Sequence, residues 1–213
     1  MKIYKPSEIQ IIDSSENIVN NLLNNKKPIL KKFNNLINSY SEIKLTSGAE
    51  NLLIDKLFQE LGGKIRFPRV GDNNERFDAF LNFDKYYALA EIEIPSISIL
   101  DAPRNLLDNY AVAISRRQLA DKPIIPLVIF WDIPNKRTDY WNVIYDIKNV
   151  LGIEIKTISL SAIALHYWSK TPLDLINDYY LDSDNQKMET AISIFNKNNI
   201  SAEHGLGYLE PIK

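Results

Sequence analysis

Three acidic residues, Asp78, Glu91 and Glu93, lie in a part of the sequence that otherwise favours two β-strands. The stretches 76–83 and 87–95 are rich in aromatic and β-branched residues, and the polar residues between them suit a turn. Side chains alternate between the two faces of a strand, so Glu91 and Glu93 are expected on one face, about 6–7 Å apart. If the two strands pair as a hairpin, Asp78 can lie opposite them on that face.

This arrangement of carboxylates has two possible explanations. Carboxylates brought close together repel one another unless protons stay bound or a cation neutralises them. Oxygen ligands of this kind suit Mg²⁺ or Mn²⁺, so the sequence predicts a divalent-metal site formed by Asp78, Glu91 and Glu93. Alternation of Glu and Ile is also typical of a half-exposed antiparallel strand whose acidic side chains are solvated. Both interpretations are open from this stretch alone.

The surrounding residues, 46–96, resemble the PD-(D/E)XK nuclease superfamily, the fold of many restriction endonucleases and Holliday junction resolvases. That superfamily has a Glu in a first helix, an Asp in the second strand and a (D/E)-x-K motif in the third. Here Glu50 opens a helical stretch, Asp78 follows 28 residues later, and Glu91 comes 13 residues after Asp78. The third motif departs from the family pattern because Glu93 stands in place of the Lys, as it does in a minority of active restriction enzymes of the superfamily.

The resemblance implies a metal-dependent DNA nuclease of the endonuclease type. Asp78 and Glu91 would then bind Mg²⁺ or Mn²⁺, Glu93 would hold a second cation or the attacking water, and Glu50 would assist. Because restriction enzymes and resolvases of the superfamily generally act as symmetric dimers, the resemblance also implies a homodimer. Six residues could contact the DNA: Arg66, Arg69, Arg104, Arg116, Arg117 and Gln118. Arg116, Arg117 or Gln118 could also partly replace the absent Lys, and the alternative for each of these three is a surface salt bridge.

Two other functions are compatible with the sequence. Since Glu93 replaces the family's Lys, the chain could be a catalytically weak or inactive nuclease-fold protein that binds DNA. The formal net charge of −2 argues mildly against a protein that coats nucleic acid, because phosphate binding depends on Lys and Arg. The same charge favours an interaction module that does not bind nucleic acid.

Length and composition limit the class of protein. With 213 residues the chain can form one sizeable core, which predicts a single domain. There is no cysteine, so disulfides and thiolate metal sites are excluded. No apolar run approaches the ~20 residues that span a bilayer, and the N-terminus lacks a signal-peptide pattern. These features predict an intracellular, cytoplasmic protein without a membrane partner.

The predicted order of elements is that of an α/β protein. From residue 46 onward the pattern reads helix, three strands, helix, strand, helix, strand, which is the restriction-endonuclease-like αβββαβ core with a central mixed sheet flanked by helices. The near-continuous apolar run 123–131 is typical of a central buried strand, and 154–165 is predicted as the last strand. The single domain 1–213 divides into an N-terminal helical extension (1–45), the nuclease-like core (46–165), and C-terminal helices and tail (166–213).

Capping residues predict where several helices begin. Asp13 resembles a helix start, Thr46 or Ser47 can cap the helix that carries Glu50, and 171–180 is expected to form a further helix. The two histidines, His166 and His204, are far apart and have no ligand-spaced partner, so neither a zinc site nor a Ser-His-Asp triad is expected.

Overall fold

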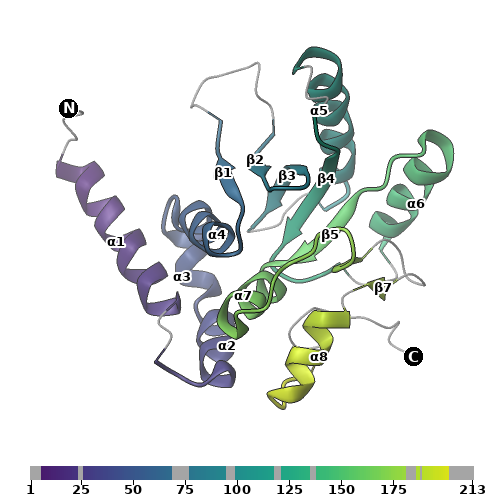
Figure 1. Cartoon of the computed structure of the whole chain (residues 1–213). Coiled ribbons are helices and arrows are strands. Elements are labelled where there is room, and N and C mark those ends of the chain that lie inside the picture. Colours follow the sequence, from purple (N-terminus) through teal and green to yellow (C-terminus); the bar gives the residue numbers. More distant parts are fainter. Residues whose placement is uncertain are drawn as a thin grey trace.

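The computed structural model describes residues 6–23, 26–68, 77–94, 99–117, 121–134, 138–180, 186–187 and 189–201. Within these ranges, helices flank one mixed sheet of seven strands (Figure 1), so the predicted α/β class is confirmed. The strands are β1 (Lys64–Arg66), β2 (Ala79–Asn82), β3 (Tyr87–Glu93), β4 (Ile124–Phe130), β5 (Lys156–Ser159), β6 (Tyr179–Tyr180) and β7 (Gln186–Lys187). The helices are α1 (Pro6–Leu23), α2 (Ile29–Asn38), α3 (Tyr40–Leu45), α4 (Ala49–Glu60), α5 (Ala102–Arg117), α6 (Asp139–Leu151), α7 (Leu160–Ser169) and α8 (Glu189–Lys197).

The strands follow one another across the sheet in chain order. β1, β2 and β3 pair antiparallel, as hairpin connections allow. β3, β4 and β5 pair parallel, which requires the crossover helices α5 and α6 between them. Right-handed crossovers made in the same direction place their helices on the same face of a sheet. Accordingly, α5 and α6 lie on one face and contact each other (Figure 1).

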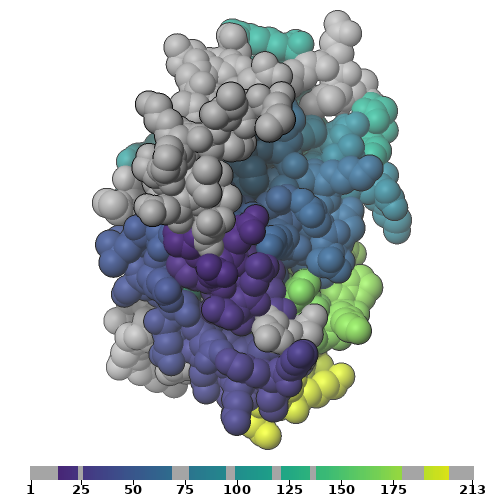
Figure 2. Space-filling model, turned by 90° about the vertical axis from the view of Figure 1, so that its left-hand side faces the viewer, coloured from purple at the N-terminus to yellow at the C-terminus, as the bar shows by residue number. Residues whose placement is uncertain are grey.

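Helices cover both faces of the sheet. α5 packs on β3 and β4, whereas α4 and α7 contact each other and pack on β1 and β5 respectively. α4 contributes Leu53, Leu57 and Phe58, all fully buried, and truncation of such a side chain to Ala typically costs about 2–5 kcal/mol. α1 and α2 lie outside α4 and α7, and Figure 2 shows them on the face of the molecule turned toward the viewer.

Two predicted helix starts are wrong. α1 already begins at Pro6 rather than near Asp13, which is consistent with the preference of proline for the first turn of a helix. α4 has Gly48 as its N-cap at φ +80°, with no side-chain cap hydrogen bond. Because this left-handed conformation suits glycine best, Gly48 rather than Thr46 or Ser47 sets the entry into the helix.

The expected strand 154–165 is also wrong in its second half. β5 ends at Ser159, and α7 begins with the next residue. The Ser159 hydroxyl accepts a hydrogen bond from the amide of Ala162 at 3.2 Å, which is the N-cap interaction that starts a helix. The apolar residues after Ser159 are buried as one helix among α2, α4 and α8, so burial on all sides, rather than strand alternation, explains their pattern.

The helix expected over 171–180 does not form. Residues 171–178 adopt loops and turns, and β6 follows them. The Asp174 carboxylate accepts hydrogen bonds from the amide of Ile176 at 2.9 Å and from the Asn177 side chain at 2.7 Å. An Asp that bonds to nearby backbone competes with helix formation, so this local turn prevails over the helical spacing of the apolar residues.

In the ranges given above, none of the helices has the combination of length and apolar character that crossing a membrane requires.

Gly63, where α4 turns into β1, permits close packing that a larger residue would block. A Cβ at Gly63 would lie 2.7 Å from Cζ and 2.8 Å from Cε1 of Phe83. The Phe83 ring is buried and packs against Phe58 and Tyr86, at centroid distances of 6.1 and 4.7 Å. We therefore expect Gly63→Ala to lower the free energy of unfolding by about 1–3 kcal/mol, measured by urea denaturation followed by circular dichroism.

Ser193→Ala on the exposed side of α8 is the control, and should change the free energy by less than about 0.5 kcal/mol. An unchanged unfolding midpoint for Gly63→Ala would mean that the Phe83 ring moves aside without cost.

Candidate functional site

Asp78 lies opposite Glu91, one residue beyond the regular pairing of β2 with β3. The Asp78 amide donates a hydrogen bond to the carbonyl of Ala90 at 3.1 Å, and Asp78 Oδ2 accepts one from the amide of Ile92 at 2.8 Å. These two bonds fix Asp78 to β3 on either side of Glu91. Strand pairing therefore brings two acidic side chains together that are 13 residues apart in the sequence.

Glu91 is a buried carboxyl group with only 6% of its surface exposed. Its Oε1 accepts a hydrogen bond of 2.7 Å from Nδ2 of Asn109 on α5, which is buried to the same extent. Burial, followed by the negative charge of Asp78, raises the pKa of Glu91 to about 8, although the bond from Asn109 opposes this. Near neutral pH the Glu91 side chain therefore keeps its proton unless a cation lies beside it.

Asp78 also lines a pocket of about 300 Å³ on the side of the hairpin that faces α4. Although Asp78 as a whole residue is exposed, its carboxylate lies close against β3. Desolvation raises the pKa of Asp78, and the hydrogen bond from Ile92 lowers it. Glu50, from the first turn of α4, is half-buried in the same pocket. The other lining residues are Asn51, Phe67, Pro68, Ile92 and Ile94.

Glu93 lies one alternation further along β3 than Glu91, on the same face and half-buried. Burial and, to a smaller extent, the charge of Glu93 raise the pKa of Tyr140 on α6, so Glu93 lies close to that helix. The part of the chain that the structure describes contains no group of three or more His, Cys, Asp or Glu side chains placed to hold a metal ion. The acidic residues form two pairs. Glu50 and Asp78 line the same pocket, whereas Glu91 and Glu93 share one face of β3. The two pairs are linked by the charge repulsion between Asp78 and Glu91.

The candidate DNA-contacting residues are spread over two elements. Arg66 is exposed on β1, and Arg116 is exposed near the end of α5. Arg104 forms a surface salt bridge with Asp101 at 3.5 Å on the exposed start of α5. Arg69, Gln118 and the side chain of Arg117 lie outside the described residues.

Asn109, which bonds to Glu91, belongs to the site although the sequence does not predict a role for it. It lies on the buried side of α5, three residues after Leu106 and four before Ala113, both of which are buried. A polar residue in an apolar helical stripe signals a buried hydrogen bond. The sequence does not identify its partner, because Glu91 lies 18 residues away and on another element.

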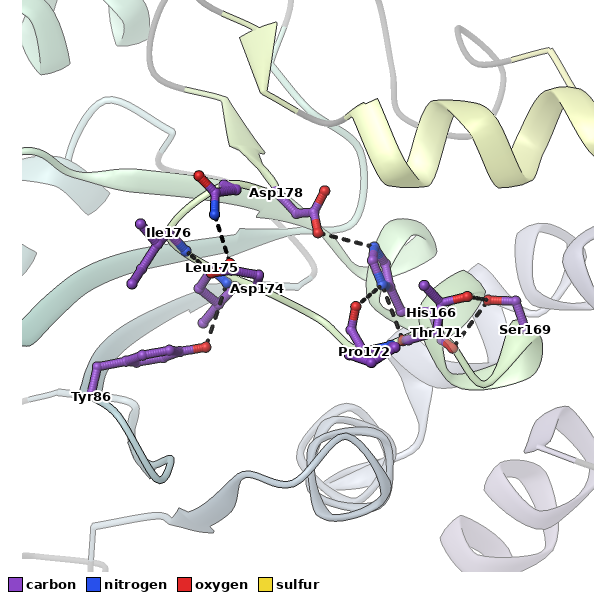
Figure 3. Close-up of polar contacts among 10 residues, drawn as sticks. Tyr86, His166, Ser169, Thr171, Pro172, Asp174, Leu175, Ile176 and Asp178 are labelled. Carbon is purple, nitrogen blue, oxygen red and sulfur yellow. Dashed lines mark hydrogen bonds and ion pairs between the residues drawn. The ribbon is translucent and has the colours of Figure 1, made fainter.

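His166 lies in a separate polar network between α7 and the segment that follows it (Figure 3). The ring is fully buried, and its Nδ1 lies 3.0 Å from the carbonyl of Pro172 and 3.3 Å from that of Thr171. Because carbonyls only accept hydrogen bonds, Nδ1 carries a proton. Nε2 lies 4.0 Å from the carboxylate of Asp178, and burial lowers the pKa of His166. The contacts attach 171–178 to α7, and burial keeps the ring out of contact with solvent.

Comparison of the chain with protein-family models and with curated proteins gives no match.

The raised pKa of Glu91 makes stability depend on pH. Between its usual value of 4.5 and about 8, the folded state keeps a proton that the unfolded chain loses, so stability falls as pH rises through this window. Glu91→Gln keeps an acceptor for Asn109 and does not titrate. We therefore expect the variant and the wild type to be equally stable near pH 4, and the variant to be more stable by about 2–5 kcal/mol at pH 8.

This difference is measured by urea unfolding in EDTA at a series of pH values. Glu42→Gln, at an exposed position on α3, is the matched control and should follow the wild type throughout. Parallel curves for Glu91→Gln and the wild type would show that Glu91 ionises normally in the folded protein.

Proposed function

We propose that this chain is a metal-dependent DNA endonuclease of the PD-(D/E)XK superfamily. The observation that carries the proposal is the electrostatic interaction between Asp78 and Glu91 on paired strands, with Glu91 buried at a position where a strand needs no charge. Ionisable groups with strongly shifted pKa values cluster at functional sites. The neighbouring pocket, which Glu50 and Asp78 both line, would give a phosphodiester access to Asp78.

The order of the elements supports the nuclease-like core. A helix carrying Glu50 precedes the antiparallel set β1, β2 and β3, and a crossover helix leads to the parallel strand β4. Asp78 lies directly before β2 and Glu91 in the second half of β3, the two strands on which the superfamily motif places its acidic residues.

The donor set fits a hard divalent cation. Carboxylate oxygens are the ligands that Mg²⁺ and Mn²⁺ prefer, and a cation would relieve the repulsion between Asp78 and Glu91. Asn109 orients Glu91, as hydrogen-bond partners of metal ligands commonly do. A cation bound to these two carboxylates would lower the pKa of a bound water and stabilise the departing 3′ oxygen.

The protein's own side chains would position the reacting groups. Asp78 is held in place by the amide of Ile92, so its carboxylate needs little reorganisation on binding. Glu50 faces the same pocket and would accept a hydrogen bond from the attacking water. Glu93 stands where the superfamily has Lys, and would hold a second cation or the water. By analogy with the superfamily, we also propose that the protein acts as a homodimer.

A nuclease-fold protein that binds DNA without cutting it is the second candidate. Two observations favour it: Glu93 in place of Lys, and the lack, among the described residues, of a group of three acidic or histidine side chains placed for a metal. A module that does not bind nucleic acid is favoured only by the net charge of −2.

Cleavage assays separate these candidates. We expect cleavage of supercoiled, linear or four-way-junction DNA with Mg²⁺ or Mn²⁺, and its loss in EDTA. Asp78→Asn keeps the shape of the side chain but removes its charge, and should lower the cleavage rate about 100-fold or more. Asn109→Leu removes only the partner of Glu91, and should lower the rate about 10- to 100-fold.

Asp84→Asn is the matched control, since Asp84 is exposed in the turn of the same hairpin, and should cleave at the wild-type rate. Binding without cleavage by the wild type would favour the second candidate. Failure to bind any of these DNAs at low salt would favour the interaction module.

A further inference from the structure

Two neighbouring aromatic rings with a cation at each end form a row that crosses β1, β2 and β3 and ends at Lys122, just before β4. The Arg66 guanidinium carbon lies 5.7 Å from the ring centre of Phe80, and the Phe80 and Tyr87 rings are 5.2 Å apart. The Lys122 Nζ lies 5.1 Å from the ring centre of Tyr87. We call these four residues the aromatic row. Such contacts between cations and rings are attractive, so they hold the row together.

The aromatic row lies on the face of the sheet that carries Glu91. Phe80 pairs with Leu89 in the β2–β3 ladder, so the two side chains share a face. Tyr87, Leu89 and Glu91 alternate along β3 and share that face as well. Leu89, which lies opposite Phe80, is two residues before Glu91 on the same strand, so the two side chains are about 6–7 Å apart. Asp78 is two residues before Phe80 and shares that face of the chain, so a strand of nucleic acid whose phosphate lies at Asp78 would reach the Phe80 ring with an adjacent base.

One end of the aromatic row is fixed by hydrogen bonds. Lys122 Nζ donates to the carbonyl of Phe83 at 2.9 Å and to Asn82 Oδ1 at 3.1 Å. The Tyr87 hydroxyl donates to the carboxylate of Asp121 at 3.0 Å. These bonds orient the Tyr87 ring before any ligand binds, which lowers the entropic cost of binding.

The other end of the aromatic row is accessible to solvent. Arg66 is exposed and Phe80 is half-buried, while α5 packs over β3 and β4 further along the sheet (Figure 1). The Arg66 guanidinium carbon lies 5.7 Å from the ring centre of Phe80 and 5.6 Å from that of the buried Phe77. Arginine and aromatic side chains are the groups on which unpaired bases stack.

We propose that the aromatic row binds unpaired bases, so that the substrate is single-stranded or locally unpaired DNA next to the cleaved phosphate. This inference rests on the proposed nuclease function for the identity of the ligand. Bases within a duplex are already stacked and paired, and the flat rings of a sheet surface cannot reach their faces. Arg66 and Lys122 provide the positive charge that the adjoining phosphates require.

The test is fluorescence anisotropy of labelled oligonucleotides, in EDTA so that no cleavage occurs. Wild-type protein should bind a single strand more tightly than a duplex of the same sequence. Phe80→Leu should weaken single-strand binding about fivefold or more, with a smaller effect on the duplex, whereas Phe80→Tyr, which keeps a ring, should restore it. Tyr145→Leu replaces an exposed aromatic residue of α6, and should bind like the wild type.

Thermal unfolding of each variant shows whether it is folded at the assay temperature. If Phe80→Leu only destabilises the fold and binds the single strand as tightly as wild type, the row serves cross-strand packing and the inference is overturned. Equal affinity of the wild type for single strand and duplex also overturns it. Base-dependent binding without any cleavage would keep the inference and reject the nuclease. If Phe80→Leu cleaves DNA and binds the single strand as well as the wild type does, the nuclease proposal stands and the inference about the aromatic row is rejected.

Discussion

The arrangement of the site depends on the attachment of Asp78 to the backbone of β3. Its hydrogen bonds with the backbone of Ala90 and Ile92 hold the Asp78 carboxylate near that of Glu91. Glu91 is buried beneath α5. Glu91 is in register with Val128 of β4, and an apolar residue there would serve the sheet better. The protein instead keeps a charge-bearing group whose ionisation is opposed by burial and by its neighbour, which is the pattern expected of a functional group rather than a structural one.

Much of this arrangement follows from local sequence. The apolar run of β4 predicts a strand buried on both faces, and the turn between β2 and β3 predicts a hairpin, because each pattern is satisfied by residues close in the chain. Strand alternation then places Glu91 and Glu93 on one face. In the register that the hairpin adopts, Asp78 lies opposite Glu91.

Other features depend on contacts that the local pattern does not determine. The residues after Ser159 are apolar in a run that suits a strand or a buried helix equally, and the packing of α2, α4 and α8 around them decides for the helix. The segment 171–178 is set by the bonds of Asp174 and by the carbonyls that surround His166. Asn109 acquires its role only when α5 packs on β3. In each case the determining interaction joins residues whose relative position is fixed by the tertiary fold.

The geometry of β3 makes the proposed nucleic-acid function compatible with the net charge of −2. The acidic residues of the site contribute to that total, yet they lie at the end of β3 where a cation would offset them, and the positive charges of Arg66 and Lys122 flank its beginning. Recognition of a nucleic acid depends on the local field rather than on the total charge. One strand carries Tyr87 of the aromatic row and Glu91 of the acidic pair, so under the proposed function its regular repeat would set the distance between a bound base and the phosphate.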